Sequence, residues 1–362
     1  MCGIAGYFGL QIPDQNRLQQ TSNVLRHRGP DGEGIYTHQF QKNGVALVHR
    51  RLAIIDLDER SNQPFRLDKC VLVFNGEIYN YLELRLDLAN LGHAFRTSGD
   101  TEVLAHALKQ WGIAALDRLE GMWAFAWYDE DKGNLLLSRD RFGEKPLYYW
   151  KHSGGLYFAS EIKGLAAMAG EWPAHNEDHL LRYLINGYKA LHKTPETFYQ
   201  GIEELPHACC LTISPKGIET PKSYWQPSLK EDQSLSYEDA VAMTRESLID
   251  AVKIRMRSDV PLAFCMSGGI DSNALISIAS NVFNYDVHGF TIVNQDSRYI
   301  EQDMVNTAVR AQSLKHTEVP LETKGFLSNL RTLVRQHDAP VFTISAYCHW
   351  LLMDAIKQAG YR

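Results

Sequence analysis

The second residue of this chain is a cysteine whose position allows nucleophilic chemistry. Removal of Met1 leaves Cys2 with a thiol, of ordinary pKa about 8.5, and an α-amine, of ordinary pKa about 7.7 to 8.0, on the same Cα. Such an amine can take the thiol proton, directly or through a water, so no histidine is required. The alternative is that Cys2 is a small buried apolar residue on a first strand, as most single cysteines are.

Four polar segments follow Cys2 in the first half of the chain. They are Arg-His-Arg-Gly-Pro-Asp-Gly at 26–32, Asn-Gly-Glu-Ile-Tyr-Asn at 75–80, Ser-Gly-Asp-Thr-Glu at 98–102 and Arg-Asp-Arg-Phe-Gly-Glu-Lys-Pro-Leu-Tyr-Tyr at 139–149. Together, and in this order, they resemble the glutaminase domain of class II glutamine amidotransferases, and within that class the asparagine synthetase branch. The resemblance covers residues 1 to about 170 and implies a hydrolase of the N-terminal-nucleophile type that acts on glutamine.

Glutamine hydrolysis at a thiol passes through a tetrahedral oxyanion, which needs hydrogen-bond donors fixed where its charge develops. Asn75 can offer a side-chain amide and Gly76 a backbone N–H, with no side chain to block the approach of a substrate. Asn-Gly is also the strongest two-residue hairpin signal, so an ordinary turn is the alternative. The resemblance to the family places Cys2, Asn75 and Gly76 in the catalytic machinery.

The charged ends of glutamine require charged partners. Its α-carboxylate suits a guanidinium fork, and its α-ammonium suits carboxylates. Arg51 matches the carboxylate-binding arginine of the family, because the arginine stands directly before a leucine, and Glu77 and Asp100 match its ammonium-binding pair. Neighbouring residues of a strand point to opposite faces, so Arg50 is expected at the surface.

Length and composition limit the class of protein. A chain of 362 residues predicts two domains, and 44% hydrophobic with 22% charged residues is typical of a globular protein in water. A net charge of −6 predicts no nucleic-acid or membrane partner. No run reaches the length of a transmembrane span, and 1–9 lacks the basic start of a signal peptide. The six cysteines lack metal-ligand spacing, which favours a reducing cytoplasmic location.

The first half is rich in short strands, which predict layered antiparallel sheets with flanking helices, an α+β domain. A connector with an amphipathic stretch and a strand pair follows. The expected strands are 46–48, 71–74, 123–128, 135–138, 147–150 and 156–159. The expected helices are 81–91 and 101–111. In the connector, the amphipathic stretch is expected at 178–185 and the strand pair near 208–213. We expect a glutamine amidotransferase domain over 1–172 and the connector, with inter-domain packing, over 173–235.

The remaining residues, 236–362, predict an α/β domain. Helical periodicity begins near Ser236, a buried strand is expected over 260–266, and 287–293 with 316–319 continue a βαβ pattern and hence a parallel sheet. Between the first strand and the next helix lies Ser-Gly-Gly-Ile-Asp-Ser at 267–272. A glycine turn at a helix N-terminus can hold a phosphate, although a tight connection is the simpler explanation.

The run from Ser258 to Ser272 resembles the pyrophosphate loop of the ATP-dependent half of asparagine synthetases. The resemblance implies ATP and Mg²⁺ as cofactors, with Asp271 as the carboxylate associated with pyrophosphate and the metal. The implied loop and adenosine contacts are Met266, Ser267, Gly268, Gly269, Ser272 and Ile292.

These two halves predict coupled chemistry: glutamine is hydrolysed at Cys2, and the ammonia is transferred to an adenylated carboxylate, by default aspartate. Another carboxylate acceptor, such as a sugar acid, stays open, as does a homodimer. The alternatives are a glutaminase with a regulatory or non-catalytic nucleotide-binding second domain, and a non-catalytic interaction protein. A β-lactam-forming synthetase is a weaker rival, because such enzymes lack the N-terminal cysteine.

The family pattern continues past a helix like 346–359 with a further strand, a second glycine-rich acidic segment and a catalytic lysine. This chain ends at Arg362. We therefore expect a complete glutaminase half and an incomplete, C-terminally truncated synthetase half, which hydrolyses glutamine without making asparagine.

Overall fold

The short apolar runs of the first half pair into two antiparallel sheets. The computed structural model describes residues 1–294 and 302–362, and its chain divides into a first unit, Met1–Ser228, and a second unit, Leu229–Arg362. In the first unit one sheet has the strand order β10-β8-β9-β1-β3-β2. Its strands are β1 (Gly3–Gly9), β2 (Gly32–Phe40), β3 (Asn43–Arg51), β8 (Tyr148–His152), β9 (Gly155–Ala159) and β10 (Ile202–Glu204).

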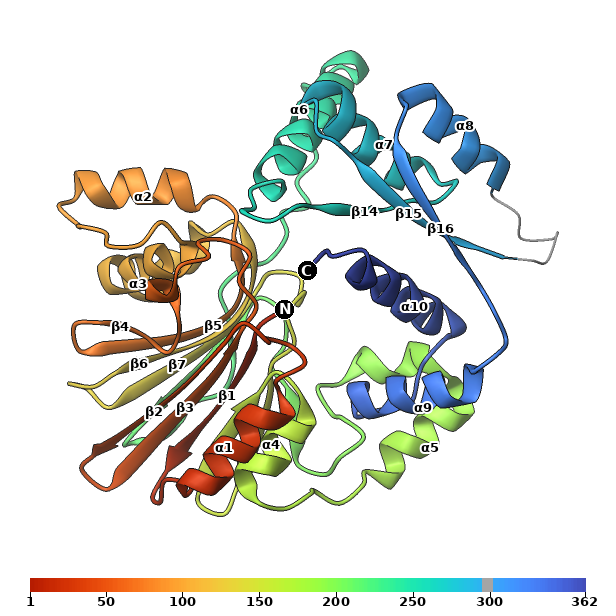
Figure 1. Cartoon of the computed structure of the whole chain (residues 1–362). Helices are drawn as coiled ribbons and strands as arrows, with labels where there is room; N and C mark the ends of the chain where they lie inside the picture. Colours follow the sequence, from red (N-terminus) through yellow and green to blue (C-terminus); the bar gives the residue numbers. More distant parts are fainter. Residues whose placement is uncertain (295–301) are drawn as a thin grey trace. The chain divides into compact units, whose positions relative to one another are not determined.

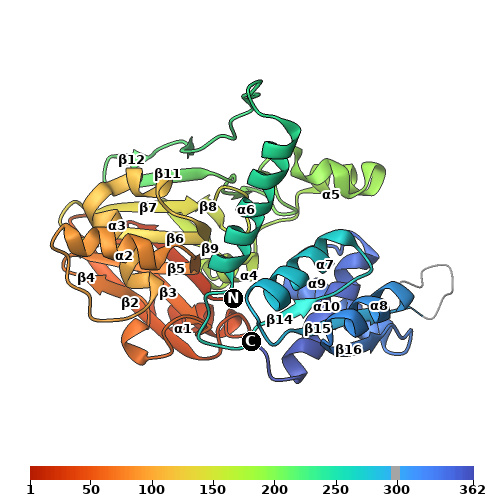
Figure 2. The same ribbon diagram turned by 90° about the horizontal axis from the view of Figure 1, so that it is seen from above.

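The other sheet has the order β12-β11-β7-β6-β5-β4, with β13 also paired to β11; Figure 2 shows the succession from β11 through β7 to β6. Its strands are β4 (Phe65–Leu67), β5 (Cys70–Ile78), β6 (Gly121–Asp129), β7 (Asn134–Arg139), β11 (Cys209–Ser214), β12 (Gly217–Ile218) and β13 (Lys222–Ser223). Strands β10 and β11 arise from the predicted connector, and they extend one sheet each. The division at residue 172 stays a prediction.

Helices cover the outer face of each sheet, which gives four layers (Figure 1). The helices are α1 (Gln15–Val24), α2 (Tyr81–Asn90), α3 (Asp100–Trp111), α4 (Ile162–Ala169) and α5 (Glu177–Asn186), with the short 3₁₀ helices η1 (Glu59–Ser61), η2 (Gly112–Asp117) and η3 (Tyr188–Lys193). One apolar cluster lies between the sheets, a second under α2 and α3, and a third under α1 and α4. The predicted layered α+β fold and its strands are confirmed.

The second unit is built on a parallel sheet, with the order β14-β15-β16. Its elements are α6 (Tyr237–Arg255), β14 (Ala263–Cys265), α7 (Ile270–Ser277), the π-helical turn η4 (Ile278–Val282), β15 (His288–Val293), α8 (Gln302–Gln312), β16 (Lys315–Pro320), α9 (Phe326–His337) and α10 (Ile344–Gln358). Helices α7 and α8 lie on one face of the sheet and α10 on the other (Figure 1). The predicted βαβ pattern and parallel sheet are confirmed.

One prediction about this sheet is wrong. The first strand was expected to be buried over 260–266, but β14 is three residues long and its side chains are partly or fully exposed. The physical reason is its place: among the described strands, β14 has a neighbour on only one side. Among the described residues, no helix of either unit is both long and apolar enough to cross a membrane.

Candidate functional site

Cys2 lies just before β1, in a position fixed by the neighbouring strand. The β1–β3 register pairs Gly3 with Arg50, which brings Cys2 beside the end of β3. Its Sγ lies 3.4 Å from the backbone N–H of Leu52, and Arg28 Nε donates a hydrogen bond of 2.9 Å to the Cys2 carbonyl oxygen. Burial raises the pKa of the Cys2 thiol, so the thiol needs a base to ionise it.

The pKa of the α-amine at the chain start is shifted in the opposite direction. Burial, and with it the cations of Arg28 and Lys145, lower the pKa of the Met1 α-amine to about 6, against the opposing effects of the Cys2 thiol and the Glu77 carboxylate. An amine in this environment is mostly unprotonated at pH 7. This amine belongs to Met1, so the predicted role of the Cys2 α-amine as the base stays a prediction.

Asn75 has the properties of an oxyanion-binding residue. Its side chain is fully buried on β5, yet neither its amide nitrogen nor its amide oxygen has a hydrogen-bond partner among the described residues. A buried unpaired amide is costly, which suggests that a ligand supplies the missing partner. The next residue, Gly76, has no room for a side chain, because a Cβ would collide with the carbonyl oxygen of Met122.

The free edge of β5 supplies a second donor. Strand β4 pairs with β5 only as far as Leu72, and none of the described strands pairs with the edge beyond it. There the N–H of Phe74 donates to the side chain of Gln63 and that of Ile78 to Asp100. Because N–H groups alternate along a strand, the N–H of Gly76 points to the same side, between these two. The Gly76 N–H thus points to this edge, one residue after the unpartnered amide of Asn75.

Arg51 is buried and well anchored. Its Nη1 donates to the carbonyl oxygen of Asp58 at 2.8 Å and to the side chain of Asn62 at 2.9 Å, and its Nη2 donates to the carbonyl oxygen of Asp56. A guanidinium has five N–H donors. Nε and one N–H of Nη2 therefore have no acceptor among the described residues, and they can form the fork that a carboxylate needs.

The prediction that Arg50 lies at the surface is wrong. Arg50 is only 7% exposed, its Nε donates to the carbonyl oxygen of Ser22 at 2.9 Å, and its Nη2 pairs with Glu33 at 2.8 Å. The opposite face of β3 is covered by α1, so an arginine there needs its own partners.

Glu77 and Asp100 are the two carboxylates predicted for the site. Asp100 begins α3, and its Oδ2 accepts the N–H of Ile78 at 2.9 Å. Burial raises the pKa of Asp100 to about 6. Burial and then the charge of Asp100 raise the pKa of Glu77 to about 7, against the charge of Lys145. The charges of Asp100 and Arg51 also act on the thiol of Cys2, so the predicted glutaminase residues form one cluster.

Sequence reasoning missed Asp56, which connects the two ends of this cluster. Its carbonyl oxygen accepts from Arg51, while its carboxylate accepts from Ser98 N at 2.8 Å and Ser61 Oγ at 2.7 Å. The Ser98 contact holds the turn that leads into Asp100. Asp56 adopts a positive φ of 54°, which aspartate tolerates better than most residues, but no motif marked it.

Two residues of the 139–149 motif also had no predicted role. Asp140 is fully buried and accepts backbone N–H groups of Trp123, Phe142, Glu144 and Lys145 at 2.9–3.2 Å. Lys145, which this loop carries, is 6% exposed. The motif was the signal that could have identified both.

In the second unit the predicted phosphate loop leads into α7. Gly269 is the N-terminal capping residue of this helix and offers no side chain to its first N–H groups. Asn273 Nδ2 donates to the carbonyl oxygens of Ser267, at 2.9 Å, and Gly269, at 2.7 Å, which fixes the turn. The hydroxyls of Ser267 and Ser272 lie 3.0 Å apart.

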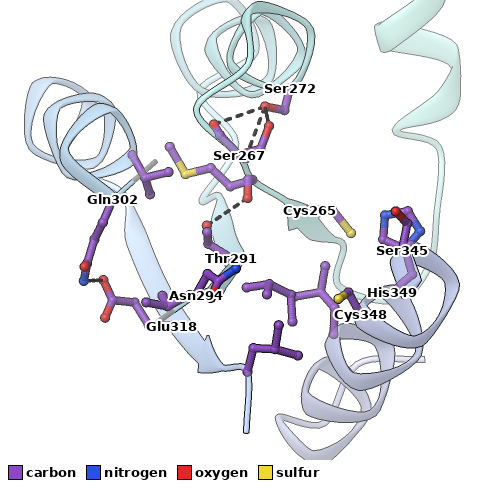
Figure 3. Close-up of a pocket in the computed structure, with 16 residues that line it drawn as sticks. Cys265, Ser267, Ser272, Thr291, Asn294, Gln302, Glu318, Ser345, Cys348 and His349 are labelled. Carbon is purple, nitrogen blue, oxygen red and sulfur yellow. Dashed lines mark hydrogen bonds between the residues drawn. The ribbon is translucent and has the colours of Figure 1, made fainter. Parts of the chain in front are cut away.

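A pocket of about 480 Å³ opens beside this loop (Figure 3). Four of the predicted nucleotide contacts line it: Met266, Ser267, Ser272 and Ile292. Gly268, Gly269 and Asp271 are not among its lining residues, and Asp271 is exposed to solvent in the first turn of α7. No group of three histidine, cysteine or acidic side chains within 1–294 and 302–362 could hold a metal ion.

The comparisons with known proteins define the class. The sequence model of the glutamine amidotransferase domain family matches residues 1–225, and that of the asparagine synthase family matches residues 243–362. Asparagine synthetase (glutamine-hydrolyzing) 1 of Bacillus subtilis is 32% identical over 94% of this chain and 53% of its own length. Putative asparagine synthetase (glutamine-hydrolyzing) 2 of Methanocaldococcus jannaschii is 31% identical over 90% and 66%.

Amidase chry2 of Gibberella zeae is 33% identical over 78% of this chain and 43% of its own length. The chain therefore belongs to the glutamine amidotransferase domain family, and its residues 243–362 also match the asparagine synthase family. It spans between about two fifths and two thirds of the length of these three relatives.

Proposed function

We propose that this chain hydrolyses glutamine at Cys2, after removal of Met1, and that the ammonia is used to amidate a carboxylate activated by ATP. The observation that carries this proposal is the buried, unpartnered amide of Asn75 on the strand that also carries Gly76 and Glu77. A purely structural asparagine in that place would leave two polar atoms unsatisfied at a cost of roughly 1 to 3 kcal/mol each.

The proton transfers follow from the α-amine and the thiol. The neutral amine takes the proton of the Cys2 thiol, and the thiolate attacks the side-chain amide carbon of glutamine. The oxyanion that forms accepts hydrogen bonds from Asn75 Nδ2 and the Gly76 N–H. The α-ammonium returns its proton to the leaving nitrogen, ammonia departs, and water hydrolyses the thioester to glutamate.

Glutamine itself is held at both ends. Its α-carboxylate binds the free Nε and Nη2 N–H groups of Arg51, and its α-ammonium binds Asp100 and Glu77. Both groups lie on rigid elements, since Arg51 ends β3 and Asp100 begins α3.

The pocket of the second unit suits a nucleotide. Its volume lies in the range of ordinary ligand sites, and the uncapped start of α7 can accept a phosphate. When bound, ATP supplies the adenylyl group that activates the acceptor. Because Mg²⁺ is usually held by one or two carboxylates and phosphate oxygens, Asp271 alone suits an ion that arrives with ATP.

Aspartate is the proposed acceptor, because the Bacillus and Methanocaldococcus relatives are named asparagine synthetases. Another carboxylate, such as a sugar acid, is the alternative acceptor. Incubation with glutamine, ATP and a panel of carboxylates, with pyrophosphate release as the readout, separates the two. Release of no pyrophosphate with any acceptor would agree instead with the expectation that the synthetase half is incomplete.

The cysteines support a reducing location. All six are free, and Cys209 and Cys210 are buried. Free thiols persist in reducing compartments, so the cytoplasm is the proposed location. A homodimer stays a prediction.

The decisive experiment measures glutamate and ammonia released from glutamine. Cys2→Ala should abolish release, and so should an N-terminal extension that cannot be removed, because an acylated amine is no base. Cys70→Ala, which removes another half-buried thiol of the same unit, should retain it. Full activity of Cys2→Ala or of the extended chain would refute the assignment.

A further inference from the structure

His49 is a fully buried histidine on β3, two residues before Arg51. Strand alternation places its side chain on the same face as Arg51 and as Leu47, which belongs to the apolar cluster between the two sheets. Its Nε2 donates a hydrogen bond of 3.1 Å to the carbonyl oxygen of Phe74 on β5. The ring therefore connects the strand that ends at Arg51 to the strand that carries Asn75.

The contact with Phe74 determines which nitrogen of the His49 ring carries the proton. A carbonyl oxygen only accepts, so Nε2 is protonated and Nδ1 has a lone pair. Nδ1 has no hydrogen-bond partner among the described residues. Burial, and with it the charge of Arg51, lower the pKa of His49 to about 3, against the hydrogen bond to Phe74. A polar ring with an unsatisfied nitrogen costs free energy in a core, so its presence calls for a function of the hydrogen bond that it makes.

Phe74 is held by side chains at both of its backbone polar groups. Its N–H donates to Gln63 Oε1 at 2.6 Å, and its carbonyl oxygen accepts from His49. The amide of Gln63 is itself oriented, because its Nε2 donates to Thr101 Oγ1 at 3.3 Å. None of the described strands pairs with this edge of β5 beyond Leu72, so the two side chains supply the hydrogen bonds that a neighbouring strand would make.

The anchored residue comes directly before the two proposed oxyanion donors. Beyond these donors, Asp100 accepts the N–H of Ile78 at 2.9 Å. The backbone between Phe74 and Ile78 is therefore fixed at both ends. Because the carbonyl group of Phe74 and the nitrogen of Asn75 share one planar peptide, the hydrogen bond from His49 sets the orientation of the plane from which the Asn75 side chain extends.

We infer that His49 is a positioning residue of the glutaminase reaction, whose hydrogen bond to Phe74 holds the Asn75 amide and the Gly76 N–H in the orientation that the oxyanion requires. The inference rests on the proposed function, because these two groups are the oxyanion donors there. His49 acts through the backbone and does not itself contact glutamine. Donors stabilise a transition state when they are already directed at the developing charge, and a misplacement by about 1 Å can cost about a hundredfold in rate.

The test compares His49→Met with His49→Gln in the whole chain. The two substituted side chains are of similar length, but only the amide in His49→Gln can donate to the Phe74 carbonyl oxygen. The kcat of glutamine hydrolysis should fall by roughly ten- to hundredfold in His49→Met, and His49→Gln should recover most of this loss. Glutamine affinity, measured by titration calorimetry with Cys2→Ala added to each variant, should stay close to that of Cys2→Ala alone, since Arg51 and Asp100 still hold the substrate.

His38→Met is the matched control. It removes a half-buried histidine of the same unit, whose Nδ1 lies 3.0 Å from the hydroxyl of Tyr128, and it should leave kcat unchanged. The inference would be overturned by an unchanged kcat in His49→Met or by an equal loss in both His49 variants. A loss of glutamine affinity as large as the loss of kcat would also overturn it, because His49 would then support the fold of the whole site.

A second measurement does not depend on activity. Backbone hydrogen exchange in the peptide that covers 72–78 should be roughly tenfold faster in His49→Met, as expected for one lost hydrogen bond, and close to wild type in His49→Gln. If His49→Met fails to fold, His49→Leu provides the same comparison. If the wild-type chain releases no glutamate, the proposed function fails instead, and unchanged exchange in His49→Met would separately overturn the anchoring of β5 by His49.

Discussion

The carboxylate of Asp100 acts directly on that of Glu77 across the free edge of β5. Burial, and next the charge of Asp100, raise the pKa of Glu77 to about 7, and burial raises the pKa of Asp100 to about 6. A buried and a half-buried carboxyl group that repel each other favour a cationic ligand, which relieves their repulsion. In the proposed function, this relationship makes the binding of the glutamine ammonium sensitive to pH.

We predict that glutamine affinity rises with pH between 5 and 8. At pH 5 both carboxyl groups are mostly protonated and neutral, and at pH 8 both are ionised and can pair with the ammonium. Titration calorimetry of glutamine with Cys2→Ala, which cannot hydrolyse it, should show a Kd at least tenfold lower at pH 8. A Kd independent of pH would exclude this pair as the ammonium site.

Glu77→Gln should stabilise the fold at alkaline pH while weakening glutamine binding. The folded pKa of Glu77 lies above its ordinary value, so the ionised side chain costs stability, and this cost develops between pH 4.5 and 7 and is complete above pH 7. We expect a gain of about 1 to 3 kcal/mol at pH 8 and almost none at pH 4. Thermal unfolding at the two pH values measures it, and equal gains at both would contradict it.

Substitution of the two neighbouring arginines should have different effects, one on glutamine binding and the other on stability. Arg51→Lys removes the fork and should weaken glutamine binding by roughly 1 to 3 kcal/mol. Arg50→Lys should leave KM unchanged but lower the free energy of unfolding by about 1 to 2 kcal/mol, since Ser22 and Glu33 lose part of their partner. Steady-state kinetics and denaturant unfolding measure these effects. Reversed effects would show that Arg50, and not Arg51, binds the glutamine carboxylate.

Asp56→Asn should raise KM for glutamine severalfold with little change in kcat. Asparagine tolerates the positive φ, but it is a weaker acceptor for Ser98 N and Ser61 Oγ. The turn before Asp100 would then be held less firmly. Asp58→Asn, which changes an exposed carboxylate of the same loop, is the matched control. A kcat loss without a KM change would point to another role.

Much of the first unit could be predicted because its signals are local. Apolar runs such as 71–74 and 123–128 form strands β5 and β6 at the expected places. Cys2, Arg51 and Asp100 belong to motifs with recognisable order. Their proximity follows from the pairing of β1 with β3 and from the contact between β5 and the start of α3.

Other features depend on contacts that leave no mark in the sequence. Asp56 acts through Arg51 and Ser98, which are 5 and 42 residues away, and hydrogen bonds to backbone groups impose no residue pattern. Arg50 was placed wrongly because strand alternation predicts only a face and not what covers that face. The exposure of β14 depends on its edge position, which the order of strands along the chain does not reveal.

Four backbone N–H groups donate hydrogen bonds to the carboxylate of Asp140, and this affects which substitutions the loop at 140–145 can accept. Since the loop donates only main-chain N–H groups to Asp140, these contacts do not depend on the side chain at position 144, whereas the ring of Phe142 also packs edge-on against Trp225. Position 144 could therefore be recoded, for example to introduce a fluorescent or cross-linking residue, without loss of the contacts to Asp140. Asp140 thus holds the backbone of the loop through contacts that the exposed side chain at position 144 does not enter.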